Sequence, residues 1–371
     1  MSEPIYFNSP DIEDETLEEF IINLYESLEV IEHDLVVLER DPTNANTIAS
    51  LFRQVLTIKT NCRLAFVEPL FRYMHNMEEV VAGMQTGRIP FSTYLKESIL
   101  IALDYLRNCA ETLAQVGKLE ITLVQAVEQE FAQMASAEPQ RVQLQAERII
   151  EMLTGMEVDV AASTDTSEEM MAEEEEEESE TLVDADLVFF HEVSERVDAH
   201  SPFWPGRTRR LYGMAMALNR ELDDAVDDRA LMAAVYLHDF GMLFIPEALL
   251  AKTGKLEPDE KALIQKHVDF GWEWLRRMPD WYETALMVYH HHERVDGSGY
   301  PNGLMGDEIH IGGKILAVAD TFYSITTERA DRNYKRSIIR AITEINNCVN
   351  KQFDEDVVAA FNRVIKRLHS K

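Results

Sequence analysis

Apolar residues recur at three- and four-residue spacing along most of this chain, whereas strand-like alternation is scarce. The clearest example is residues 17–40, where Phe20, Leu24, Ile31 and Leu35 fall on one face of a helix. Four further stretches of the first half repeat the pattern, namely residues 47–60, 67–86, 91–117 and 119–154. Helical spacing resumes at about residue 186 and persists to the end. The pattern predicts an all-α protein whose first half is a helical bundle.

One stretch breaks the helical pattern through its composition. Residues 163–186 read STDTSEEMMAEEEEEESETLVDAD, a block of like charges with little apolar surface to bury. Such a block repels itself, which favours a disordered linker, although an acidic docking tail is the alternative. We therefore expect a helical domain at residues 1–160, an acidic linker at 161–186 and a second helical domain at 187–371.

The net charge and the hydropathy of the 371-residue chain argue against some classes of binding partner. Its formal net charge of −32 argues against binding DNA, because phosphate recognition needs clustered Lys and Arg. No apolar run approaches the roughly 20 residues that cross a bilayer, and the acidic N-terminus is unlike a signal peptide. We expect a cytoplasmic protein with no membrane partner. Binding of a small anionic ligand remains compatible with the negative net charge, since a bound metal can supply local positive charge.

The stretch LFRQVLTIKTNCRLAFVEPLFRYMHNMEEVVAGMQTGRIP, residues 51–90, resembles the histidine-phosphotransfer domains of chemotaxis-type kinases. Their second helix carries Phe-Arg-x-x-His-Thr-Ile-Lys-Gly, and Leu56 stands at the position of the phosphoryl-accepting histidine. Leucine has no nucleophilic nitrogen, so relay chemistry is not expected there. The resemblance places His75 at a packing position. We expect this domain to bind signalling proteins or to form a homodimer.

Polar side chains interrupt the apolar helices of the second half at four places. They are His238 with Asp239, then His267, then the run His290–His292, and finally Asp320, which closes the apolar stretch ILAVAD. A single His or Asp at a helix end is usually a cap or a satisfied hydrogen-bonding group. Together, however, they form a mixed nitrogen and oxygen donor set that suits Fe, Mn, Ni or Zn. Such a set favours two metals bridged by a shared Asp, which clamp a phosphoryl group and activate water.

This series is similar to the HD superfamily of metal-dependent phosphohydrolases, and HHERVDGSGYP narrows the resemblance to the HD-GYP family. The similarity runs from LHDFGMLFIPEALLAKTGKLEPDEKALIQKH through HHERVDGSGYPNGLMGDEI to ILAVADTFYSITTERADR, roughly residues 187–365. Members of this family hydrolyse cyclic di-GMP, a bacterial second messenger. Their fold is a helical bundle that encloses two or three metal ions.

The resemblance assigns roles residue by residue. One metal would be held by Asp239, His267, His291 and His292, and the other by His238, Asp239 and Asp320. The catalytic residues implied are Asp239 and Glu293, where Glu293 supports the paired histidines. The substrate-binding residues implied are Arg294, Gly299, Tyr300, Pro301 and Lys314, the last of which stands where Arg is usual. His290 falls on a family position that is not a ligand.

Two departures from the family pattern concern activity. The family's first ligand, a histidine three residues before an arginine, is replaced by Trp204 before Arg207, and tryptophan binds no metal. His200 is a candidate substitute, although prolines around it disfavour a regular turn. Met242 replaces the lysine of His-Asp-x-Gly-Lys, which removes a cation near the phosphate. Tyr323 also stands where an acidic residue is usual.

Two functions therefore fit the sequence. The first is a cyclic di-GMP phosphodiesterase of reduced activity, which the His-His pair and the GYP loop favour. The second is a degenerate domain that senses the nucleotide or binds a partner, which Leu56, Trp204 and Met242 favour. Hydrolysis of a different phosphoester is a third alternative, because the sequence does not identify the residues that would recognise a base.

Overall fold

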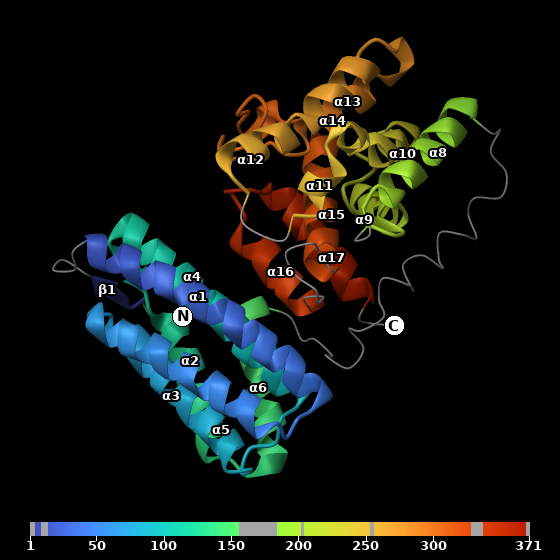
Figure 1. The fold of residues 1–371 in the computed structure, drawn as a ribbon. Helices are drawn as coiled ribbons and strands as arrows, with labels where there is room; N and C mark the ends of the chain where they lie inside the picture. The colour runs from blue at the N-terminus through green and yellow to red at the C-terminus, as the bar shows by residue number, and fades with distance from the viewer. Residues whose placement is uncertain are drawn as a thin grey trace. The chain divides into compact units, whose positions relative to one another are not determined.

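The computed structural model describes residues 4–8, 14–155, 184–201, 204–252, 256–327 and 337–368 (Figure 1). The chain divides into two compact units, Met1–Ala161 and Ala162–Lys371. The all-α class is confirmed, because helices dominate the described residues and their one sheet has two short strands. The predicted linker lies outside the described residues except for its last three, which begin a helix.

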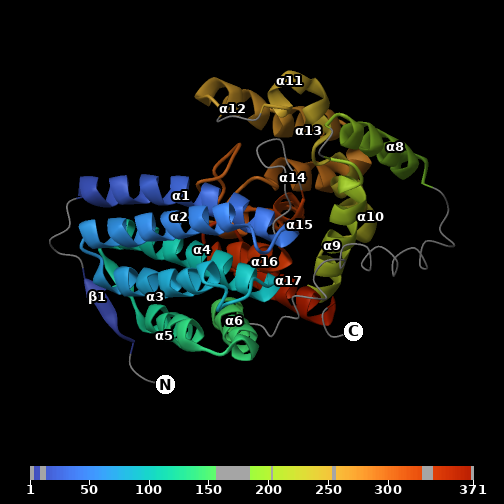
Figure 2. The ribbon, with the colours of Figure 1, turned by 60° about the horizontal axis from the view of Figure 1, so that its bottom comes forward.

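The first unit is a bundle of long helices. They are α1 (Asp14–Arg40), α2 (Ala45–Leu64), α3 (Glu68–Gln85), α4 (Thr93–Val116), α5 (Thr122–Ser136) and α6 (Pro139–Thr154). Strands β1 (Tyr6–Asn8) and β2 (Lys118–Glu120) pair antiparallel. Figure 2 shows α1, α2 and α3 alongside one another, and α2 packs against both of its neighbours.

The amphipathic pattern explains the core of this bundle. Leu24, Ile31 and Leu35, which lie on the predicted stripe of α1, are buried. Side-chain caps fix the helix starts: Asn44 accepts a hydrogen bond from the Thr47 amide, and Ser92 accepts one from Leu95. Leu56 on α2 is 37% exposed, so an apolar side chain faces solvent where the resemblance places a nucleophilic histidine.

The second unit is built from shorter helices. In chain order they are α8 (Ala185–Ala199), α9 (Arg207–Glu221), α10 (Asp228–Leu237), the 3-10 turn η2 (Phe240–Phe244), α11 (Glu247–Leu250), α12 (Pro258–Gln265), α13 (His267–Leu275), η3 (Pro279–Trp281), α14 (Tyr282–His290), η4 (Gly306–Glu308), α15 (Ile311–Thr326), α16 (Ile338–Asn347) and α17 (Glu355–Leu368). Helix α10 packs on α8, α9 and α14, while α15 packs on α9, α14, α16 and α17.

The ends of these helices deliver the polar residues singled out by the sequence. His238 follows α10 directly, His267 opens α13, and His291 follows α14. Asp320 differs from expectation, because α15 continues to Thr326 instead of stopping at the aspartate. The reason is that Tyr323 and Ile325 continue the buried face of this helix. No helix among the described residues has the length and apolar content to cross a membrane.

Candidate metal centre

Three buried histidines share one hydrogen-bonding arrangement. The Nδ1 atom of each ring lies close to the carbonyl oxygen three residues earlier: 2.7 Å for His238 and Val235, 2.8 Å for His267 and Ile264, and 2.6 Å for His291 and Val288. A carbonyl oxygen only accepts, so each Nδ1 must carry the proton and donate. The Nε2 atom of each neutral ring is then an unprotonated lone pair, the form that binds a metal.

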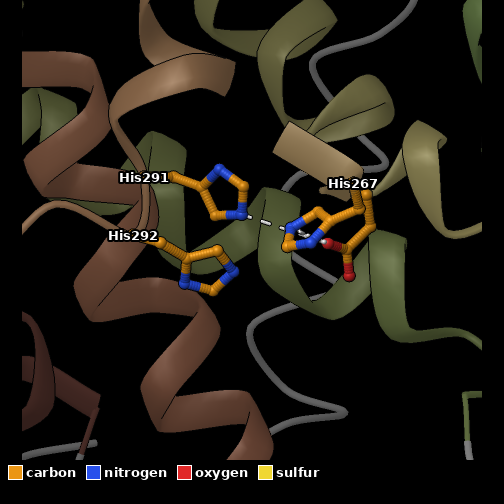
Figure 3. Close-up of side chains that lie close together, drawn as sticks. His267, His291 and His292 are labelled. Carbon is orange, nitrogen blue, oxygen red and sulfur yellow. Dashed lines mark ion pairs between the residues drawn. The ribbon is translucent and has the colours of Figure 1, made fainter. Parts of the chain in front are cut away.

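These lone pairs converge on one carboxylate. The Nε2 atoms of His267 and His291 lie 3.3 Å and 3.9 Å from Oδ1 of Asp239. One donor atom each from Asp239, His267, His291 and His292 lies within 4.8 Å of the others. Figure 3 shows the rings of His267, His291 and His292 directed into a common space. This is the set that the resemblance assigns to one complete metal site.

Several metal-binding atoms in this cluster and beside it are buried without a hydrogen-bond partner among the described residues. They are Oδ1 of Asp239 and Nε2 of His238, His267 and His291. An unsatisfied buried polar atom costs roughly 1–3 kcal/mol, so four at one place require a ligand to satisfy them. A cation with imidazole and carboxylate ligands meets that need, and the residues therefore fit the metal that the sequence predicts.

The ionisation states agree with this interpretation. Burial lowers the pKa of His291 to about 3, with further lowering from His267 and His238. Burial likewise lowers the pKa values of His267 and His292, so these rings stay neutral at neutral pH. Burial alone would raise the pKa of Asp239, but Arg207 and the surrounding histidines hold it well below its usual range. The cluster therefore combines neutral imidazoles with an ionised carboxylate.

A close backbone approach brings Asp239 and His267 together. A Cβ atom built on Gly241 would lie 2.0 Å from the carbonyl oxygen of His267, which no real side chain tolerates. Glycine therefore lets η2, the turn that follows Asp239, pack directly against the start of α13. The glycine of HDFG is needed for this approach rather than for an unusual φ.

Arg207 also belongs to the site, although the sequence motif only served to locate Trp204 relative to it. Its Nη1 donates to Oδ2 of Asp239, and its Nη2 donates to Oδ1 of Asp320 at 2.6 Å. Burial alone would lower the pKa of this guanidinium, but Asp239 and Asp320 raise it, so the group is charged. Asp320 is thus bound to Arg207 and lies outside the four-residue cluster.

His238 also lies outside that cluster. Its Nε2 is 3.6 Å from Oδ2 of Asp239, the oxygen that Arg207 binds, and its ring meets His291 edge to face. His200 does not reach the cluster: its ring nitrogens lie 3.2 Å from the Ile245 carbonyl oxygen and 3.7 Å from the Glu247 carboxylate. The suggested substitute ligand is therefore in contact with residues outside the cluster.

The GYP loop is organised by Glu293. Its Oε1 accepts the Asn302 amide at 2.7 Å, and its Oε2 accepts the Leu304 amide at 3.0 Å. Glycine is required at position 299, since a Cβ there would lie 2.4 Å from the Arg294 nitrogen. Both Glu293 oxygens hold the loop, which agrees with the supporting role that the resemblance implies, and its catalytic role stays a prediction.

The same loop stacks Tyr300 on His292, a candidate metal ligand. The Tyr300 ring lies 4.8 Å from that of His292 with an interplanar angle of 25°, and the Tyr300 amide donates to the His292 carbonyl oxygen. His290, by contrast, accepts the His310 amide on its Nδ1 at 3.1 Å. This bond gives His290 a packing role beside the two histidines of the cluster.

A cavity of about 640 Å³ opens over the cluster. The predicted residues that line it are Asp239, His267, His291, His292, Glu293, Arg294, Gly299, Tyr300 and Asp320. Trp204, Met242 and Tyr323, the departures from the family pattern, line it as well, together with Lys261. Pro301 and Lys314 are not among the lining residues. Lys314 is buried in an ion pair with Asp354 at 2.7 Å, and its contact with substrate stays a prediction.

Residues 192–357 match the family model described as an HD domain. The chain is 32% identical over 173 residues to the 3'3'-cGAMP-specific phosphodiesterase 3 of Vibrio cholerae, a match covering 46% of this chain and 37% of that protein. It is 39% identical over 137 residues to the cyclic di-GMP phosphodiesterase of Thermotoga maritima, covering 36% and 37%. It is 41% identical over 103 residues to the cyclic di-GMP phosphodiesterase response regulator RpfG of Xanthomonas campestris, covering 27% of each. The chain thus spans little more than a third of the first two relatives and about a quarter of the third.

Proposed function

We propose, from the membership of residues 192–357 in the HD-domain family, that this protein is a metal-dependent phosphodiesterase of the HD-GYP type. Cyclic di-GMP is the substrate we propose, since the sequence resembles that family and several relatives are named for this activity. The observation that carries the proposal is the cluster of unpartnered buried donors around Asp239, which opens into a cavity of about 640 Å³.

The metal we propose is Fe, Mn, Ni or Zn, held by Asp239, His267, His291 and His292. Bound there, it would supply Lewis-acid polarisation of a phosphoryl oxygen and a lowered pKa for water. The protein itself contributes the fixed tautomers of two ligands, since the carbonyl oxygens of Ile264 and Val288 hold the ring protons of His267 and His291 away from the metal side. These contacts orient the ligands before any metal binds.

The wall of the cavity suits a cyclic dinucleotide. Tyr300, held parallel to His292, offers a flat apolar face, and Arg294 adds a guanidinium that is anchored to Gln352 at 2.7 Å. A guanidinium pairs well with phosphate oxygens, and an aromatic face can stack on a base or a ribose. Met242, buried on the same wall, adds no charge, so we expect slow turnover.

Nucleotide sensing without hydrolysis is the second candidate, which the loss of a cation at Met242 and of a ligand at Trp204 favours. Under this alternative the domain would bind cyclic di-GMP and report it to a partner. We propose that the first unit supplies the partner surface, for a cytoplasmic signalling protein or a second copy. Leu56, exposed on α2, supports a role in binding rather than in phosphotransfer.

The experiment is turnover of the full-length protein, purified anaerobically and supplied with Mn²⁺ or Fe²⁺. Cyclic di-GMP, 3'3'-cGAMP and bis(p-nitrophenyl) phosphate are offered separately, with His267→Ala as the control that removes a ligand. Metal-dependent formation of linear pGpG supports the proposal. Binding of cyclic di-GMP by calorimetry with no product supports the sensor. Cleavage of 3'3'-cGAMP alone would reassign the substrate, and cleavage of the nitrophenyl ester alone would indicate a different phosphoester.

A further inference from the structure

Arg207 occupies a particular place beside the proposed metal. Its guanidinium spans the two carboxylates that the resemblance assigns to the second metal, Asp239 and Asp320, and it bonds to one oxygen of each. The side chain of Arg207 is only 9% exposed. A buried cation therefore already lies between the two carboxylates where a second cation is expected.

The two oxygens of Asp239 face different partners. Oδ1 has no hydrogen-bond partner among the described residues and lies 3.3 Å from Nε2 of His267, within the four-donor cluster. Oδ2 accepts from Arg207. The carboxylate is therefore shared between an open metal position on one side and a guanidinium on the other.

The residues around the guanidinium suit an organic cation better than a metal. The Arg207 guanidinium carbon lies 5.2 Å from the Trp204 ring centroid and 5.9 Å from that of Tyr323. Aromatic faces attract a guanidinium through cation–π contact, whereas neither Trp nor phenolic Tyr is a good ligand for a divalent metal. Trp204 and Tyr323 are also the positions at which this sequence departs from a histidine and an acidic residue.

We propose that the centre holds a single metal ion and that the guanidinium of Arg207 takes the place of the second. The inference deepens the proposed function, since it rests on the metal site of Asp239, His267, His291 and His292. The charges support it, because one divalent ion together with Arg207 would already outweigh the two negative charges of Asp239 and Asp320. A second divalent ion would have to share those carboxylates with a buried guanidinium or displace it.

The proposal predicts how many metal ions two variants bind. Restoring the lost ligand alone, by Trp204→His, should not create a second metal site, because the guanidinium still covers Asp320. Combining it with Arg207→Gln should open the site, since the charge leaves and a histidine is added. Arg207 itself belongs to the family pattern and Trp204 does not, so the two variants separate the effect of the lost ligand from that of the guanidinium.

The test is metal stoichiometry of the full-length protein, by equilibrium dialysis against Mn²⁺ and elemental analysis. We expect one ion per chain for wild type and Trp204→His, and two for Trp204→His with Arg207→Gln. Arg209→Gln, an exposed arginine on the same helix, is the matched control and should keep one ion. Circular dichroism checks that each variant is folded.

Electron paramagnetic resonance of the Mn²⁺-loaded wild type gives an independent readout that needs no variant. An isolated Mn²⁺ spectrum at saturation agrees with a single ion beside Arg207, whereas an exchange-coupled pair would overturn the inference. Two ions per chain in wild type would also overturn it and leave the proposed phosphodiesterase standing. No bound ion under anaerobic conditions would overturn both.

Discussion

At the scale of single residues, neighbouring histidines differ in the contact that their Nδ1 atom makes. His291 donates through Nδ1 to the Val288 carbonyl and leaves Nε2 without a partner among the described residues. His290, one position earlier, instead accepts the His310 amide through Nδ1. The first arrangement leaves a buried lone pair for a metal, and the second uses the ring as a packing element. Adjacent positions therefore offer a matched pair for mutation.

The first prediction uses that pair. His291→Gln should abolish high-affinity metal binding, because it removes a neutral imidazole donor from a cluster of four. His290→Gln should keep metal binding and lower the free energy of unfolding by about 1 kcal/mol, the value of one hydrogen bond. Metal content after dialysis and urea unfolding of both variants measure these effects. Equal loss of metal in the two would contradict the assignment.

A second prediction concerns Met242, a buried residue on the cavity wall. Met242→Lys places an ammonium where the family carries one, so turnover of cyclic di-GMP should rise, on the order of 100-fold, as for one added transition-state stabiliser. Metal content should not change, because Met242 lies outside the donor cluster. Met242→Leu is the control of similar volume and should leave turnover as it is. If the lysine variant gains nothing while metal is bound, the cavity has diverged beyond this position.

At the scale of elements, the GYP loop is attached to the site through Glu293. The residue directly follows His292, and its two oxygens hold the amides of Asn302 and Leu304. The loop in turn places Tyr300 against the His292 ring. The carboxylate thus connects a metal ligand to a wall of the cavity without touching the metal cluster in the described contacts.

Glu293→Gln gives the third prediction. One amide loses its charged acceptor, which costs about 1–3 kcal/mol, so the loop should loosen and turnover fall by roughly tenfold. Metal content should be unchanged, and this distinguishes a positioning role from a ligand role. The control is Glu308→Gln, since Glu308 also accepts a backbone amide, that of Met305 at 2.9 Å, but does so at the exposed turn η4. A fall in metal content in Glu293→Gln would show that the residue acts on the metal itself.

At the scale of the whole molecule, the hydrophobic periodicity and the motifs predicted the features that are determined by residues close together in the chain. The buried stripe of α1 and the grouping of Asp239, His267, His291 and His292 followed from spacing and from the resemblance. Arg207 could not be predicted in the same way, because its bond to Asp320 joins residues 113 positions apart and depends on how α9 packs on α15. The pairing of Lys314 with Asp354 is a similar long-range contact. The sequence thus identified the candidate donors and missed the long-range ion pairs, of which those of Arg207 involve Asp239 and Asp320.

The unfolding of the metal-free protein should depend on pH through the buried histidines. In the folded state burial lowers the pKa of His291 from its usual value of 6.5 to about 3. Below pH 6.5 the unfolded chain therefore binds a proton at His291 that the folded chain does not bind. The free energy of unfolding then decreases as the pH falls. At pH 5 the loss is about 2 kcal/mol for this one histidine. Asp239 and Asp320 do not contribute in this window, because their pKa values are lowered and their stabilisation disappears only below about pH 4.

Tryptophan fluorescence measures this effect for the second unit alone, since all four tryptophans, Trp204, Trp272, Trp274 and Trp281, lie there. Urea midpoints of chelator-treated protein should fall between pH 7 and pH 5, and less steeply in His291→Gln, which has lost one titrating ring. Saturating Mn²⁺ should move the fall to lower pH, because a metal-bound imidazole competes with the proton. A midpoint that is flat from pH 7 to pH 5 in the metal-free protein would mean that these histidines take up protons in the folded protein as readily as in the unfolded chain. The lowered pKa values that keep the donor set neutral would then be wrong.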